Sequence, residues 1–282
     1  MSAGGKISRP IAFIVLAVLP FLKPAGVSAF LQDNDSTPLK AILRKSAAYC
    51  EGVRRAALFF ICEERIREEI YPSSKRSRIA RFRTVKQQDK NEYVYDYQLV
   101  KKDERVEESR TLIEENGVKK KVPNAPLKTK RFMSLKTAYA GADFIGPSTQ
   151  SLYSYDYLGE DRVLRRDAYL LRSRPKIESE AAQSYGRIWV DKESFAILKI
   201  EREPESTEGF AELKEKAASK ALWPVLSIVH EFGIEKNGVR FPSRTEYRES
   251  YAGNFIPKFE YSRATIDYSN YKFFIVEVTI EQ

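Results

Sequence analysis

Apolar and polar side chains alternate along most of this chain, and this pattern constrains the fold more than any other feature of the sequence. In the clearest segment Tyr93, Tyr95, Tyr97 and Leu99 share one side, with mostly polar residues between them. Successive side chains of a strand point to opposite faces, so this spacing is typical of a strand with one buried face. Similar segments recur between residues 57 and 280. We therefore expect a mainly β protein.

Turn signals between these segments predict antiparallel neighbours. Asn116-Gly117 and Asn237-Gly238 are typical of two-residue hairpin turns, and 191–194 predicts another reversal. Residues 36–54 and 208–222 instead repeat apolar side chains every three or four positions, which predicts two amphipathic helices. A long strand series with few helices favours one large curved antiparallel sheet or a partial barrel, an α+β arrangement with the helices as a lid.

The connection between the two halves of this strand series has a different composition. Residues 119–131 are basic and contain Pro123 and Pro126, which predicts an exposed connection. Residues 132–142 are then expected to form a short helix.

The N-terminus has the order of a secretory signal peptide. Two basic residues precede the apolar run Ile11–Leu22, and the small-residue triplet Val27-Ser28-Ala29 follows it. The run is shorter than the ~20 residues that span a bilayer. We expect cleavage after Ala29, so that residues 1–29 are removed and residues 30–282 form a single periplasmic or secreted domain. An uncleaved membrane anchor is the alternative.

The charge balance indicates which classes of partner to expect. The full chain carries a formal net charge of +9, and removal of three basic residues with the signal peptide leaves it mildly basic. Basic and acidic residues are interleaved, for example within 101–105, which indicates solvated faces and not a stripe that follows phosphates. We expect no nucleic acid partner, a monomer, and peripheral contact with an anionic membrane surface as an open alternative.

Two cysteines remain, Cys50 and Cys62. An even pair at short spacing predicts a disulfide in an oxidising compartment, and two buried thiols are the alternative.

Residue types needed for catalysis are scarce. His230 is the only histidine and lies in a strand-like segment, with no G-x-S-x-G nucleophile motif elsewhere. No zinc-binding or phosphate-binding motif is present, so no metal and no cofactor are expected. Carboxylate pairs such as Glu63-Glu64 and Glu68-Glu69 keep a carboxylate-dependent hydrolase as a third hypothesis.

One hairpin-like segment resembles a known family. Gly186–Asp191 reads G-x-I-W-V-D, and Ile197–Glu201 follows it as I-L-K-I-E. This pattern, behind a signal peptide, a helix and a strand series, is similar to periplasmic lipoprotein carriers of the LolA type, including outer-membrane lipoprotein-sorting proteins and RseB-type sensors. The resemblance implies an unclosed β-barrel with helices as a lid over an apolar cavity that holds acyl chains.

These observations predict an exported, non-enzymatic protein that binds a lipophilic ligand or an acylated lipoprotein on a concave sheet face. An envelope protein-interaction or sensor module of the same fold is the alternative hypothesis. Rows of aromatic residues can line a core or a pocket. The candidate cavity residues are Tyr93, Tyr95, Tyr97, Ile188, Trp189, Val190, Leu198 and Ile200.

Overall fold

The computed structural model describes residues 38–71, 89–102, 105–131, 140–176, 185–207 and 209–277, which belong to one compact unit that begins at Thr37. The expected signal peptide, residues 1–29, lies outside the described residues, and cleavage after Ala29 stays a prediction. Among the helices that are described, none is long and apolar enough to cross a membrane.

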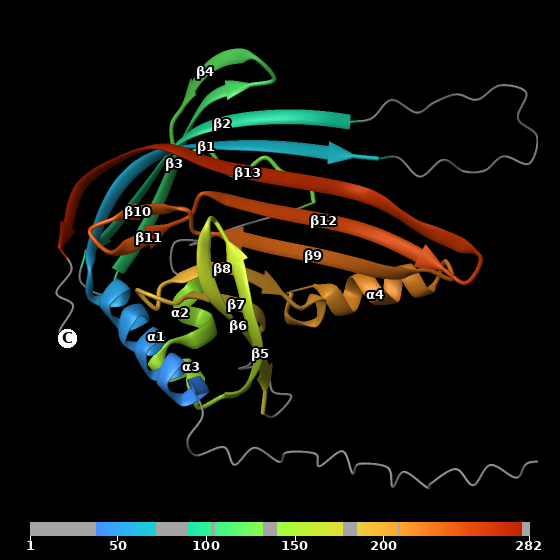
Figure 1. Ribbon diagram of the computed structural model, residues 1–282. Helices are drawn as coiled ribbons and strands as arrows, with labels where there is room; N and C mark the ends of the chain where they lie inside the picture. The colour runs from blue at the N-terminus through green and yellow to red at the C-terminus, as the bar shows by residue number, and fades with distance from the viewer. Residues whose placement is uncertain are drawn as a thin grey trace, which may run out of the picture. The chain divides into compact units, whose positions relative to one another are not determined.

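Eleven strands form one open antiparallel sheet (Figure 1), in the order β4-β3-β2-β1-β13-β12-β9-β8-β7-β6-β5. β4 and β5 are its two edges, so the sheet does not close into a barrel, and the prediction of a mainly β, unclosed sheet is confirmed. The strands are β1 (Ala57–Ile70), β2 (Asp89–Lys102), β3 (Arg105–Glu115), β4 (Val118–Val122), β5 (Tyr153–Val163), β6 (Arg166–Pro175), β7 (Gly186–Asp191), β8 (Ile197–Arg202), β9 (Trp223–Glu231), β12 (Arg244–Gly253) and β13 (Ile256–Glu277).

The first and last strands of the described chain lie side by side. β1 pairs with β13 from Ala57 opposite Glu277 to Ile70 opposite Ser262, with two register shifts near Phe60. β13 is one continuous strand of 22 residues, Ile256–Glu277. β-bulges absorb the irregular spacing without ending the strand.

The predicted hairpin turns are present. Asn116-Gly117 and Asn237-Gly238 all have positive φ, as this turn type requires. Between β5 and β6 the turn residues Leu164 and Arg165 also have positive φ, although neither residue type favours it. The second asparagine-glycine turn joins β10 (Ile234–Lys236) and β11 (Val239–Phe241), which form a separate two-stranded sheet instead of prolonging β9 and β12.

The helices cover two different parts of the sheet. The first described helix carries Ile42, Cys50 and Val53 on its buried side, and basic residues in its last turn face the negative end of the helix dipole. The helices are α1 (Pro38–Arg55), α2 (Ala140–Ile145), α3 (Pro147–Gln150) and α4 (Phe210–Ala218), with a short 3₁₀ helix at Pro204–Ser206. Figure 1 shows α1, α2 and α3 gathered beside β5–β8, and α4 next to β9. Two of these, α1 and α4, confirm the predicted amphipathic helices.

The core lies mainly on the helix-covered face of the sheet. Residues that pair across strands point to the same face, and one such row runs from Ile200 through His230, Thr245, Ile266 and Ile66 to Tyr93. All six of these side chains are buried. The row therefore links the part of the core beneath α1 and α2 to the part beside β1 and β2.

Candidate functional site

The eight predicted cavity residues are all buried, and they fall into three places. Tyr93, Tyr95 and Tyr97 line the helix-covered face of β2 and pack with β1 and β13. A second group packs beneath α1 and α2 and comprises Ile188, Val190 and Ile200. The remaining two, Trp189 and Leu198, belong to a cluster on the opposite face. No single cavity brings the eight together in this conformation, and their contact with a ligand stays a prediction.

The side chain of Trp189 points to the face of the sheet opposite the helices, and its polar contacts lie on that face. Its indole Nε1–H donates to Asp161 Oδ2 at 2.7 Å. Lys199 Nζ lies 4.3 Å from its ring centroid on the other flank. Because Trp189 alternates with Ile188 and Val190 along β7, it must point to the opposite face.

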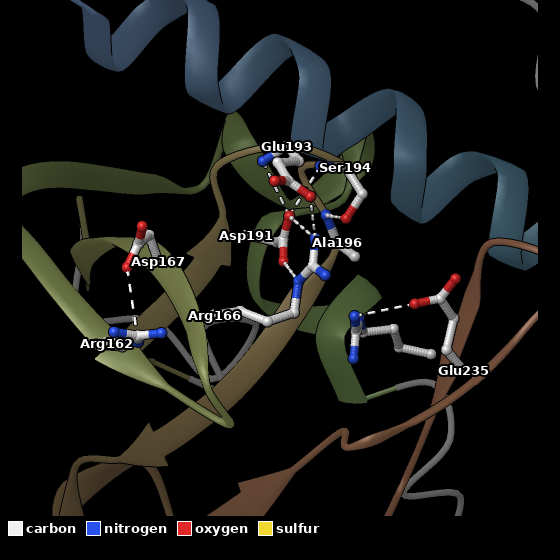
Figure 2. Close-up of polar contacts among 9 residues, drawn as sticks. Arg162, Arg166, Asp167, Asp191, Glu193, Ser194, Ala196 and Glu235 are labelled. Atoms are coloured by element: carbon white, nitrogen blue, oxygen red, sulfur yellow. Dashed lines mark hydrogen bonds and ion pairs between the residues drawn. The ribbon is translucent and has the colours of Figure 1, made fainter.

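The aspartate of the G-x-I-W-V-D segment fixes a turn (Figure 2). Asp191 Oδ1 accepts the backbone N–H groups of Glu193 and Ser194, both at 2.9 Å. Arg166 of β6 binds the same carboxylate with two nitrogens. Burial would raise the pKa of Asp191, but these hydrogen bonds outweigh it and lower the pKa to about 2. In the motif on which the family resemblance is based, Asp191 therefore stabilises the turn that follows β7.

The predicted disulfide between Cys50 and Cys62 is wrong, because the structure holds both residues as buried thiols. Cys50 Sγ lies 3.8 Å from the carbonyl oxygen of Gly141 in α2 and belongs to the core beneath α1. Cys62 lies within β1, in the core cluster that contains Tyr97. The sequence predicted that the short connection would bring them together, but the helix and the strand bury them in separate clusters.

Residues 125–131, which we call the strap, cross the helix-covered face. Tyr95 Oη donates to the carbonyl of Pro126 and accepts the backbone N–H of Lys128, both at 3.2 Å. The Glu68 carboxylate accepts the backbone N–H groups of Lys130 and Arg131 at 2.9 and 3.0 Å. The expectation of an exposed connection for 119–131 thus holds: every residue of β4 is exposed, and within the strap only Ala125 is buried, although hydrogen bonds tie its backbone to the sheet.

Three carboxylates lie fully buried beneath or beside the strap: Glu64, Glu68 and Glu249. Glu64 receives two hydrogen bonds from Arg110, at 2.6 and 3.1 Å. Glu249 receives two from Arg131, and Tyr251 and Ser262 also donate to it. These contacts give each carboxylate a structural role. Within the described ranges, no group of three or more potential ligands is arranged to hold a metal ion.

A groove of about 380 Å³ lies between α4 and the β12–β13 hairpin. Its lining combines one face of α4 and three aromatic rings with four charged side chains, of which three are basic and one, Glu212, is acidic. The residues that line it are Arg131, Gly209, Glu212, Leu213, Lys216, Ala217, Lys220, Leu222, Tyr251, Phe259 and Tyr261. Arg131 is also the last residue of the strap, and its guanidinium lies 5.2 Å from the Tyr261 ring centroid. Sequence reasoning missed this site, although Phe259 and Tyr261 alternate as aromatic residues of one strand.

Comparison with known proteins gives structural likenesses alone. No family model matches the chain, and no curated protein matches it. Among solved structures, an outer membrane lipoprotein-sorting protein domain from Vibrio parahaemolyticus is 9% identical, with 82% of this chain and 91% of that chain covered and a TM-score of 0.38. A DUF1329 family protein from Desulfovibrio piger is 13% identical over 84% of this chain and 94% of that one, with a TM-score of 0.37.

A LolA superfamily protein from Nitrosomonas europaea is also similar. It is 16% identical, with 84% of this chain and 94% of that chain covered and a TM-score of 0.31. Structures of the superfamily that the sequence resembles are thus among those similar to this chain. All three TM-scores are below 0.5.

Proposed function

We propose that this protein is an exported, non-enzymatic binding protein that holds the acyl chain of a lipophilic ligand or lipidated protein in the groove between α4 and the β12–β13 hairpin. The observation that carries the proposal is the composition of that groove. Leu213, Leu222 and Phe259 offer apolar surface, and Lys216 and Lys220 stand at the same opening. Its volume of about 380 Å³ is within the ~300–1,000 Å³ typical of small-molecule sites.

The positions of the lysines indicate how an amphiphilic ligand would be oriented in the groove. An acyl chain gains roughly 0.8 kcal/mol for each methylene that it buries, so the apolar side would supply most of the affinity. A carboxylate or phosphate head would remain near the lysines, where it keeps its water and gains attraction. The ligand class is therefore an anionic amphiphile.

The strap connects the groove with the cavity residues that the sequence predicted. Arg131 lines the groove and also ends the strap, and Tyr95 lies against the strap on the other side. A ligand longer than the groove would reach Tyr93, Tyr95 and Tyr97 by displacing the strap. Ile188, Val190 and Ile200, beneath α1, would become accessible after a larger movement of the helices.

The groove is tested with a long-chain fluorescent fatty acid and its short-chain analogue. We expect the long chain alone to bind. Leu213→Trp should weaken binding by about tenfold or more by filling the groove. Ala211→Trp is the matched control, because Ala211 is an exposed residue of the same helix that does not line the groove. Thermal unfolding of both variants establishes that they are folded.

The head-group contribution is tested separately. Lys216→Glu combined with Lys220→Glu should weaken fatty acid binding and leave binding of the corresponding long-chain alcohol unchanged. Lys214→Glu, on the exposed side of α4, should affect neither ligand. Equal and negligible binding of long and short chains to the folded protein would contradict the proposal.

A second candidate, a protein-interaction module, is favoured by one observation on β5. This strand is an edge of the sheet and exposes Tyr157 and Leu158. Edge strands can accept an added strand from another chain. Leu158→Lys would then abolish the biological activity of the protein without changing fatty acid binding, whereas a carrier would lose activity with Leu213→Trp.

A further inference from the structure

Three large apolar side chains are exposed at one end of the sheet, and we call them the apolar tip: Trp223, Phe255 and Ile256. Phe255 is 96% exposed, and Trp223 and Ile256 are each 45% exposed. The two-residue turn 254–255 joins Gly253 to Ile256, which pair with each other. Trp223, the first residue of the neighbouring strand β9, pairs with Ala252 of β12. The three residues therefore lie at the same end of three adjacent strands, where the β12–β13 hairpin protrudes past α4 (Figure 1).

The fold supports this end of the hairpin firmly. A Cβ atom added to Gly253 would lie 2.9 Å from the carbonyl oxygen of Ala221 and 3.1 Å from a methyl group of Leu222. The hairpin thus packs closely on the connection between α4 and β9. Because the backbone beneath it is packed, Phe255 is presented to solvent by the structure itself.

The net charge beside the apolar tip is positive. Lys220 and Lys258 flank it and are exposed. Within the part of the chain that the structure describes, neither lysine forms an ion pair, whereas the nearby Glu212 and Glu260 are paired with Lys216 and Arg263. An approaching surface would therefore meet two cations beside three apolar side chains.

We propose that the apolar tip docks on an anionic lipid bilayer, with Trp223, Phe255 and Ile256 in the interfacial region and Lys220 and Lys258 among the head groups. Aromatic side chains favour the membrane–water interface. Each lysine near an anionic surface adds electrostatic attraction. The bilayer is favoured over a protein partner because Phe255 is 96% exposed on a two-residue turn and can enter a fluid interface without a complementary pocket. Binding through a few side chains and two charges would be reversible.

This inference goes beyond the ligand-binding proposal and does not depend on it. If both are correct, docking would place one opening of the groove near the bilayer, because Lys220 and Leu222 line the groove and also adjoin the apolar tip. A ligand could then pass between protein and membrane over a short distance.

The two tryptophans of the chain provide a direct test. Trp223 is in the apolar tip and Trp189 is buried with 4% exposure. The protein is mixed with vesicles of phosphatidylcholine, alone or with phosphatidylglycerol. In Trp189→Phe, which leaves Trp223 as the sole tryptophan, emission should shift to shorter wavelength with the anionic vesicles and should be quenched by brominated acyl chains. In Trp223→Phe, emission should change with neither kind of vesicle.

Sedimentation with the same vesicles measures the contribution of each part. Phe255→Ser should weaken binding by about tenfold or more, since it removes an apolar side chain that would become buried. Lys220→Gln combined with Lys258→Gln should weaken binding to the anionic vesicles and reduce its salt dependence. Val118→Ser is the control, because Val118 is a 62% exposed residue on β4.

The outcomes separate the hypotheses. Unchanged vesicle binding by Phe255→Ser would overturn the inference, and this variant tests it cleanly because so exposed a side chain adds little to stability. Absence of vesicle binding by the folded protein would also overturn it and leave a protein partner as the occupant of the apolar tip. Leu213→Trp should bind vesicles normally even though it binds fatty acid poorly, so each proposal can fail independently.

Discussion

The guanidinium of Arg131 and the carboxylate of Glu249 form a two-point ion pair, with Nε 3.0 Å from Oε2 and Nη2 2.5 Å from Oε1. The pair joins the end of the strap to β12, and the Glu249 side chain is fully buried. Together with Glu68, which binds the strap backbone, it holds residues 125–131 on the face of the sheet. The strap is therefore fixed by hydrogen bonds to buried carboxylates more than by apolar packing.

We expect Arg131→Gln to lower the free energy of unfolding by about 2–3 kcal/mol. Breaking a buried pair typically costs ~3–5 kcal/mol, and the partial exposure of Arg131 and the hydroxyl donors to Glu249 reduce that cost. Urea denaturation measures the change. Lys130→Gln, which removes an exposed ion pair with Asp89, should cost less than about 1 kcal/mol. Equal effects of the two variants would show that the buried pair does not hold the strap.

The pH dependence of stability should depend on His230. Burial, and then the charge of Arg202, lower the pKa of His230 to about 3, and Thr245 Oγ1 lies 3.0 Å from Nδ1. In the unfolded chain its pKa is about 6.5. Below pH 6.5 the unfolded state therefore binds one more proton than the folded state. The free energy of unfolding has its full value above pH 6.5 and decreases as the pH falls toward 3.

This loss is measured by urea unfolding between pH 7 and pH 5, where the slope should approach about 1.4 kcal/mol per pH unit. His230→Asn should flatten the slope. Since His230 is the only histidine, its ring proton resonances can be followed directly by NMR. A titration near pH 6 in the folded protein would contradict the burial of the neutral ring.

The two cysteines should behave as protected thiols. Burial, and secondarily the charge of Glu64, raise the pKa of Cys62, which keeps its thiol protonated and unreactive. We expect slow reaction with a thiol reagent in the native state, two reactive thiols per chain in urea, and no change in Tm on adding a reductant. Detection of fewer than two thiols in unreduced, urea-unfolded protein would contradict this expectation and support the disulfide.

Gly186 should tolerate no side chain. Its φ is +154°, and an added Cβ would lie 2.1 Å from the carbonyl oxygen of Glu201. Gly186→Ala should therefore reduce stability by more than about 3 kcal/mol. Gly52→Ala is the matched control: the residue lies within α1 with open space around it, so alanine should stabilise the protein by up to about 1 kcal/mol. Similar unfolding midpoints for the two variants would show that Gly186 does not approach the Glu201 carbonyl this closely.

The local features of this fold could be predicted from the sequence because local chemistry determines them. Asn116-Gly117 supplies the backbone freedom that its turn requires, and the periodicity of α1 and α4 follows from their buried faces. The turn at Leu164-Arg165 carries no such signal, because its conformation is imposed by the register of β5 and β6.

The candidate site was less predictable, because it depends on contacts between distant segments. Arg131 and Glu249 are 118 positions apart, and nothing near either residue indicates the other. Tyr93 and Trp189 both belong to alternating segments, but alternation cannot say which face of a sheet the rest of the chain will cover. The groove similarly needs α4 placed against the aromatic residues of β12 and β13.

The pairing of β1 with β13 has a consequence for how the molecule is made. Arg67 and Asp267, in contact across this pair, are 200 positions apart. Contacts at such separation slow folding, because a long loop must close before they form. While the chain is being synthesised, β1 can pair with β2 but lacks its other neighbour, β13, until the last described strand is available. Because β13 lies between β1 and β12, the strands β1–β4 and the strands β5–β9 with β12 cannot join in one sheet until β13 is available.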